Sequence, residues 1–210
     1  MQKSFQHSLR NGKALMAKLY FKYGAMGSSK TAQALITRFN YIEMGMRVWL
    51  IKPSSDTRDG ADIIKSRIGL SAPAHVIRPG DDIQKIFDNG YSKKIDVIIA
   101  DEAQFFTPDQ IDQLHEIATW EDIPVLCFGL RTDFMLHLFP GSMRLLELAE
   151  SITEIKTICQ CGSKATCNVR FSPDGKVETE GEQVVLGGNE TYKAMCYKCM
   201  QTLIKKQNSR

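Results

Sequence analysis

The sequence has no long apolar run. No window approaches the roughly 18 uncharged apolar residues that a membrane-spanning helix needs. Residues 1–17 carry scattered Lys and Arg without an uninterrupted apolar stretch, which makes a poor signal peptide, so we expect a loose tail there. With neither an anchor nor an export signal, a cytoplasmic protein is expected.

An excess of charge of one sign is also missing. The 210 residues include 27 Lys and Arg and 24 Asp and Glu, a formal net charge of +3. Binding to nucleic acid normally requires a stronger basic excess, or a basic stripe interleaved with aromatic residues. We therefore expect neither a nucleic-acid partner nor a membrane partner.

A candidate phosphate-binding loop follows an apolar strand predicted over residues 18–23 and opens a helix predicted over 31–44. Its residues are Gly24, Ala25, Met26, Gly27, Ser28, Ser29, Lys30 and Thr31. In this context the loop N–H groups and the helix N-terminus can bind phosphates of ATP. Lys30 would reach the outer phosphates, and the Thr31 hydroxyl would hold Mg²⁺.

One position of this loop departs from the usual pattern. Ser29 stands where G-x-x-x-x-G-K-[ST] has its second glycine. Glycine is required there on steric grounds only if φ is positive, and we predict a negative φ at Ser29. Taken alone, the loop could also be a strand-to-helix turn with an incidental lysine.

Strands and helices alternate along residues 18–152. Apolar runs predict further strands at 47–51, 95–100, 124–130 and 152–158, and helices are expected at 81–89, from Pro108, and at 143–149. This alternation predicts an α/β fold with a mostly parallel sheet flanked by helices, here a P-loop nucleotide-binding domain. Asp101 and Glu102 close the strand at 95–100. Because neighbouring strand residues point to opposite faces, one carboxylate can help hold Mg²⁺ while the other accepts a proton.

Four of the six cysteines lie in the last quarter, within a segment (residues 153–205) too small to build its own core. The pairs Cys159–Cys161 and Cys196–Cys199 can supply four thiolates to one Zn²⁺. A complete thiolate set leaves no open position, so this zinc would be structural. Reduced thiols without a metal are the alternative.

These motifs occur together in an order that resembles one family. The series comprises the Gly24–Thr31 loop, Asp56-Thr57-Arg58, Asp101-Glu102-Ala103-Gln104-Phe105, Phe128-Gly129-Leu130-Arg131-Thr132-Asp133-Phe134, and two cysteine pairs that bracket Gly187-Gly188-Asn189-Glu190-Thr191-Tyr192. Over about residues 18–200 the chain closely resembles thymidine kinases of the zinc-containing type.

The resemblance implies transfer of the γ-phosphoryl group of ATP to the 5′-hydroxyl of thymidine, with deoxyuridine as a further substrate. It implies that Glu102 is the general base, that Asp101 positions Mg²⁺, that Gln104 lies on the nucleotide side, and that Arg58 and Asp56 lie near the transferring phosphate. It also implies a nucleoside pocket closed by a lasso over residues 168–192. The pocket residues would be Met26, Phe105, Leu130, Phe134, Phe139, Val185, Leu186, Gly187 and Tyr192. A homotetramer and feedback inhibition by dTTP are implied in the same way.

Two other classes of function compete with a nucleoside kinase. One is an ATP-driven nucleic-acid-binding protein with a zinc module, which the slight net charge disfavours. The other is a catalytically silent homologue, which Ser29 favours.

Overall fold

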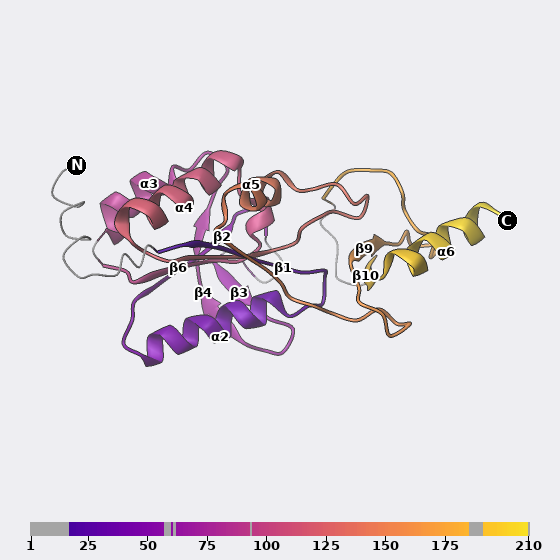
Figure 1. Ribbon diagram of the computed structural model, residues 1–210, viewed down its shortest axis with the longest axis horizontal. Helices are drawn as coiled ribbons and strands as arrows, with labels where there is room; N and C mark the ends of the chain where they lie inside the picture. The colour runs from indigo at the N-terminus through magenta and orange to yellow at the C-terminus, as the bar shows by residue number, and fades with distance from the viewer. Residues whose placement is uncertain (1–16, 57–59, 61, 93, 185–190, 210) are drawn as a thin grey trace.

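The computed structural model describes residues 17–56, 60, 62–92, 94–184 and 191–209. Figure 1 shows two parts: a sheet with helices on both faces, and a smaller C-terminal part at one end of the molecule. In the described ranges, no helix has the length and apolar character needed to cross a membrane. The predicted tail lies almost wholly outside these ranges, and the domain boundary near residue 153 remains a prediction.

The sheet has six parallel strands, which confirms the predicted α/β fold. Their order is β5-β2-β6-β7-β1-β8. The bounds are β1 (Leu19–Tyr23), β2 (Val48–Pro53), β5 (His75–Ile77), β6 (Val97–Ala100), β7 (Val125–Gly129) and β8 (Ser151–Glu154). The central strands β6 and β7 are buried along their whole length, as their continuous apolar sequences require.

Helices cover both faces of this sheet (Figure 1). One face carries α2 (Lys30–Glu43) and the antiparallel pair β3 (Ile63–Lys65) and β4 (Ser71–Pro73); the other carries α3 (Ile83–Ile86), the π-helical η2 (Phe87–Tyr91), α4 (Pro108–Glu121) and α5 (Pro140–Leu148). Each face has its own buried apolar cluster. Thr107 begins α4 with a capping box to Gln110, and a proline follows at the first helical position.

Several predicted element boundaries were wrong. The helix expected at 143–149 begins at Pro140, a second proline at a first helical position. The strand expected at 152–158 is β8, which ends at Glu154. No apolar pattern predicts β3, β4 and β5, because each has only three residues and Gly69, Pro73 and Pro79 interrupt the region.

The C-terminal part pairs β9 (Cys167–Arg170) with β10 (Tyr192–Met195) in antiparallel fashion, and α6 (Tyr197–Asn208) follows. Its buried apolar cluster consists of Cys167, Val169, Val177 and Met200. The sequence Ser172-Pro173-Asp174-Gly175-Lys176 predicts a hairpin turn, and the structure has it, since the Ser172 N–H donates to the Lys176 carbonyl at 2.9 Å. The sequence Leu186-Gly187-Gly188-Asn189 predicts a further turn, which lies outside the described residues.

Candidate active site

The carboxyl ends of three parallel strands meet at one edge of the sheet. Tyr23 at the end of β1 pairs with Gly129 at the end of β7, and Ala100 at the end of β6 pairs with Cys127. The segments that follow these strands begin with Gly24, Asp101 and Leu130. Ligands of open α/β sheets bind at this edge, and the fold thus brings three of the predicted site segments together.

The candidate phosphate-binding loop packs closely at its first glycine and turns sharply at its second. A Cβ at Gly24 would lie 2.4 Å from the Ile155 carbonyl oxygen, so a side chain has no room there. Gly27 has a φ of +76°, which glycine adopts without steric cost. The Lys30 ammonium donates to the carbonyl oxygens of Gly24 and Ala25, both at 3.0 Å. The loop therefore curls around the amine that is predicted to bind phosphate.

Ser29 contradicts our prediction of a negative φ. Its φ is 62° and its ψ is 27°, in the left-handed region, immediately before α2 begins. The chain must reverse its handedness at this point to pass from the loop into the helix, and for this reason glycine is the usual residue. A serine can adopt the same conformation at a cost of about 1–2 kcal/mol.

Asp101 lies next to Thr31, as the prediction of a shared Mg²⁺ site requires. The Asp101 side chain is 3% exposed and is hydrogen-bonded to the Thr31 side chain. Burial, and then the charge of Glu102, raise the pKa of Asp101 to about 7. A carboxylate that is costly to ionise without a cation is a suitable ligand for a divalent metal.

Glu102 is held in a strained conformation by its neighbours. Its φ is 50°, which is uncommon for a residue with a side chain, and strain of this kind is concentrated at functional sites. The Gln104 amide nitrogen donates to Glu102 Oε2 at 2.6 Å, and Gln104 Oε1 accepts the Leu130 N–H at 2.9 Å. Gln104 thus fixes the carboxylate against the segment after β7.

The other predicted site residues differ in their surroundings. Asp56 is buried and forms an ion pair with Lys52, with 3.2 Å between Lys52 Nζ and Asp56 Oδ2. The rings of Phe105 and Phe139 meet edge to face, with centroids 5.5 Å apart. Met26, Leu130 and Tyr192 are half-buried, whereas Phe134 is buried. Arg58, Val185, Leu186 and Gly187 lie outside the described residues.

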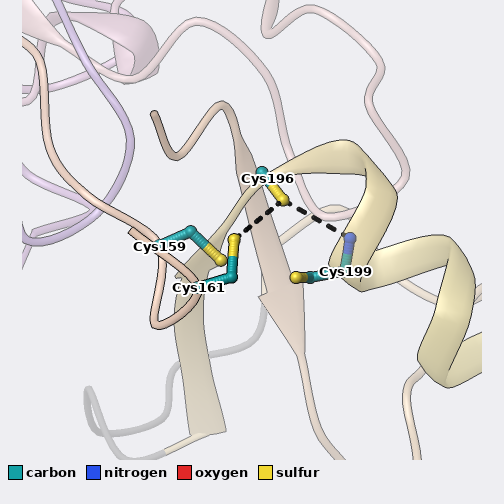
Figure 2. A group of neighbouring side chains, drawn as sticks. All are labelled: Cys159, Cys161, Cys196 and Cys199. Carbon is teal, nitrogen blue, oxygen red and sulfur yellow. Dashed lines mark hydrogen bonds between the residues drawn. The ribbon is translucent and has the colours of Figure 1, made fainter. Parts of the chain in front are cut away.

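The four predicted zinc ligands converge in the C-terminal part (Figure 2). The sulfur atoms of Cys159, Cys161, Cys196 and Cys199 all lie within 4.8 Å of one another. The separation of Cys161 Sγ and Cys196 Sγ is 3.7 Å, close to the ~3.8 Å expected between thiolates bound to one tetrahedral Zn²⁺. Hydrogen bonds from Ser163 lower the pKa of Cys161 to about 6, whereas hydrogen bonds with the neighbouring thiols, Cys196 first, raise the pKa of Cys199 to about 12. We therefore infer a metal site from the convergence of the four sulfur atoms. The donor set therefore fits Zn²⁺.

The thymidine kinase family model matches residues 17–200. This chain belongs to the thymidine kinase family. Among its relatives, the thymidine kinase of Legionella pneumophila (strain Lens) is 46% identical over 183 residues, which cover 86% of this chain and 88% of that protein. Those of Ruegeria pomeroyi and Chromobacterium violaceum are each 45% identical over 184 residues, covering 87% and 88% of this chain and 93% and 98% of theirs.

The likeness to a solved structure is much weaker than the likeness to these relatives. A structure of Pif1 helicases that unwind forked DNA matches 66% of this chain and 39% of that one, with a TM-score of 0.40 and 17% identity. A likeness at this level carries no argument about fold or function.

Sequence reasoning missed three buried polar residues of this family member. Lys52 is fully buried and donates to the carbonyls of Gly60 and Ile63 besides its ion pair. Asn168 and Arg170 are buried in β9. Lys52 directly follows an apolar run, and apolar and polar residues alternate from Ala165 to Phe171, a pattern that indicates a strand. Neither pattern shows that the polar residues are buried.

Proposed function

We propose that this protein transfers the γ-phosphoryl group of ATP to the 5′-hydroxyl of thymidine and so produces dTMP and ADP in nucleotide salvage. Deoxyuridine is a further substrate in this proposal. The observation that carries it is the meeting, at one sheet edge of a thymidine kinase family member, of the Lys30 loop with the buried pair Asp101 and Glu102. The first supplies phosphate binding and the second supplies a metal ligand and a base.

Each residue has a distinct part in the reaction. Lys30 and the N–H groups at the start of α2 bind the phosphates. Thr31 and Asp101 would hold Mg²⁺, which supplies positive charge to the phosphate oxygens when bound. Glu102, fixed by Gln104, accepts the 5′-hydroxyl proton as that oxygen bonds to the γ-phosphorus and the bond to the ADP oxygen breaks. Asp56 and Arg58 are proposed to act near the transferring phosphate.

In this proposal the transferring phosphate lies between the ATP site at the Lys30 loop and the nucleoside pocket. Phe105 and Phe139, whose rings pack edge to face, provide apolar surface that excludes water from the base. The remaining proposed contacts are Met26, Leu130, Phe134, Val185, Leu186, Gly187 and Tyr192. They combine residues that follow β1 and β7 with residues from 185–192 of the sequence.

Zinc, bound by the four cysteines, would have a structural role. Four thiols fill all positions of a tetrahedral ion, so no position is open for substrate. The ion would instead stabilise the fold of a segment that has a small apolar cluster.

Assembly and control are further parts of the proposal, and they rest on the resemblance. A homotetramer is supported by exposed apolar side chains on and after α2, namely Ile36, Phe39, Ile42, Met44 and Met46, because such surface is commonly covered between subunits. Feedback inhibition by dTTP is chemically reasonable, since its base fits the thymidine pocket and its phosphates can reach the Lys30 loop. We place the reaction in the cytoplasm.

One experiment tests the function directly. The protein is incubated with ATP, Mg²⁺ and each nucleoside in turn, and the products are weighed by mass spectrometry. We expect dTMP and ADP from thymidine and no phosphorylation of purine nucleosides. Absence of turnover with every nucleoside would favour a catalytically silent protein, and tight binding of single-stranded DNA at moderate salt would favour the nucleic-acid class.

A further inference from the structure

The two faces of β9 have different chemistry. Side chains alternate along a strand, and here Cys167 and Val169 belong to the apolar cluster of the C-terminal part. Asn168 and Arg170 point the other way and are 3% and 5% exposed. Two buried polar residues on one face of a short strand indicate that this face contacts polar groups of another segment.

Asn168 connects that strand to two loops at the sheet edge. Its Oδ1 accepts the Met26 N–H at 2.7 Å, and its Nδ2 donates to the Thr132 carbonyl at 2.9 Å. The first partner belongs to the phosphate-binding loop and the second to the segment after β7. A backbone donor on one side and a backbone acceptor on the other fix the orientation of the amide.

Arg170, the other buried polar residue of this face, contacts Phe134, Glu178 and Glu182 but not the phosphate-binding loop. Its guanidinium carbon lies 3.6 Å from the centroid of the Phe134 ring, and its Nη1 donates to the Glu182 carbonyl at 2.8 Å. It also pairs with Glu178. Arg170 therefore packs β9 against the segment after β7, whereas Asn168 is the residue of this face with a hydrogen bond to the phosphate-binding loop.

The position of Asn168 depends on the cysteine cluster. In the β-ladder Asn168 pairs with Ala194, and Cys167 pairs with Met195, which directly precedes Cys196. The Thr166 N–H also donates to the Met195 carbonyl at 2.9 Å. Whatever fixes the four thiols therefore also fixes the strand from which the Asn168 amide extends.

We propose that Asn168 is a positioning residue that couples the cysteine cluster to nucleotide binding, an inference that rests on the proposed ATP-dependent function. When the cluster is closed by Zn²⁺, β9 holds the Asn168 amide against the Met26 N–H and keeps the phosphate-binding loop in the conformation that accepts a triphosphate. Asn168 does not touch the reacting atoms. Loss of its amide removes the partner of a partly buried donor, the Met26 N–H, and of a buried acceptor, the Thr132 carbonyl, and the loop must rearrange to satisfy them.

The test measures binding of a non-hydrolysable ATP analogue with Mg²⁺ by calorimetry, without thymidine. We expect Asn168→Ala to weaken binding about tenfold or more. The matched control is Gln207→Ala: the Gln207 amide also bridges two backbone groups, accepting from the Val177 N–H at 2.9 Å and donating to its carbonyl at 3.3 Å, but both belong to the C-terminal part. Gln207→Ala is expected to leave analogue binding within about twofold of wild type.

A second measurement follows the coupling itself. Removal of zinc with a chelator should weaken analogue binding in the wild-type protein but have little further effect in Asn168→Ala, because the link is already broken. If Asn168→Ala does not fold, Asn168→Thr replaces it, since a β-branched residue suits a strand and its hydroxyl cannot span both partners. Zinc content is measured in every variant, so that loss of metal is not mistaken for loss of the amide.

Two results would overturn the proposal. The first is unchanged analogue affinity in Asn168→Ala with a raised KM for thymidine, which would place Asn168 in the nucleoside pocket. The second is additive weakening by zinc removal and Asn168→Ala. Wild-type protein that binds the analogue and yet phosphorylates no nucleoside would refute the proposed function while leaving the Asn168 result to stand.

Discussion

The sheet edge and the C-terminal part, called the cysteine-bearing segment below, are stabilised in different ways. The strands that precede Lys30, Asp101 and Glu102 lie between two large buried apolar clusters. The segment after residue 153 has a cluster of four buried residues, Cys167, Val169, Val177 and Met200, together with four converging thiols. Since apolar burial stabilises by roughly 25 cal/mol per Å², we expect the first region to fold without a ligand and the second to need its thiols.

We infer from this difference that the sheet edge holds the reacting groups and that the cysteine-bearing segment supports them. Strained or costly groups, such as Glu102 at positive φ and Asp101 with its raised pKa, are found where the surrounding core can hold them. The cysteine-bearing segment contacts that edge through individual side chains, among them Asn168 and Arg170 of β9 and Gln183, whose amide donates to the Asp133 carboxylate at 2.9 Å. Damage to the sheet edge should therefore reduce turnover, and damage to the cysteine-bearing segment should reduce affinity.

Glu102→Gln is expected to have the largest effect. The amide has nearly the same shape but cannot accept the 5′-hydroxyl proton, so turnover should fall by about 10²-fold or more. Binding of ATP and thymidine should change little, because Gln104 can still contact the side chain. Steady-state kinetics and calorimetry on the same preparation measure both; unchanged turnover would remove Glu102 from the mechanism.

Cys196→Ser is expected to raise the KM for thymidine by about tenfold before it lowers the stability of the sheet. The serine is a poor zinc ligand, and because metal binding here supplies folding energy, the segment should loosen. Elemental analysis should show close to one zinc per wild-type chain and less in the variant. Cys127→Ser is the matched control, since Cys127 is buried in β7 away from the cluster. Well below one zinc in fresh wild-type protein would contradict the zinc site.

Asp101→Asn tests how much the ionised, buried Asp101 carboxylate lowers the free energy of unfolding. The pKa of Asp101 is raised from 3.8 to about 7, so between these values the folded protein holds a proton that the unfolded chain has lost. Stability should therefore fall as pH rises from about 4 to about 7. Without Mg²⁺, Asp101→Asn should raise the Tm at pH 8 by about 3 °C or more and have little effect near pH 4.

The control for this pH dependence is Asp96→Asn. A pair with Arg47 lowers the pKa of Asp96 to about 2, the opposite direction. That variant should gain no stability at pH 8, and thermal unfolding of both variants across the pH range measures the contrast. An equal Tm for wild type and Asp101→Asn at pH 8 would mean that Asp101 carries no such cost.

Sequence reasoning was most successful where a single physical pattern decides the structure. Continuous apolar runs located β6 and β7, the Thr107–Pro108 signal located α4, and paired cysteines located the cluster. It failed where tertiary contacts decide. Asn168 and Arg170 acquire their roles from partners far away in the chain, so no local pattern could predict them.

Ser29 shows a failure of another kind. The serine led us to expect a negative φ, but the geometry of the loop prevails over the residue that occupies it. The entry into α2 requires a left-handed residue there, and Ser29 accepts this conformation. Knowledge of the residue type was therefore less informative than the loop pattern, which has glycine at that position.

Ser29→Gly is expected to have the smallest effect of the four substitutions, and its sign follows from the φ of 62°. Glycine adopts that φ without steric cost but is more flexible in the unfolded chain, so the gain in stability should be at most about 1 kcal/mol. The KM for ATP should change by no more than about tenfold, or 1.4 kcal/mol, because the backbone N–H groups stay in place. Ser28→Gly is the comparison. This substitution removes a hydroxyl that accepts from Lys30 at 3.4 Å, and it relieves no positive φ. Thermal unfolding and kinetics at saturating thymidine measure both variants. A wild-type protein without turnover that Ser29→Gly makes active would show that the sheet edge is assembled but blocked by this one side chain.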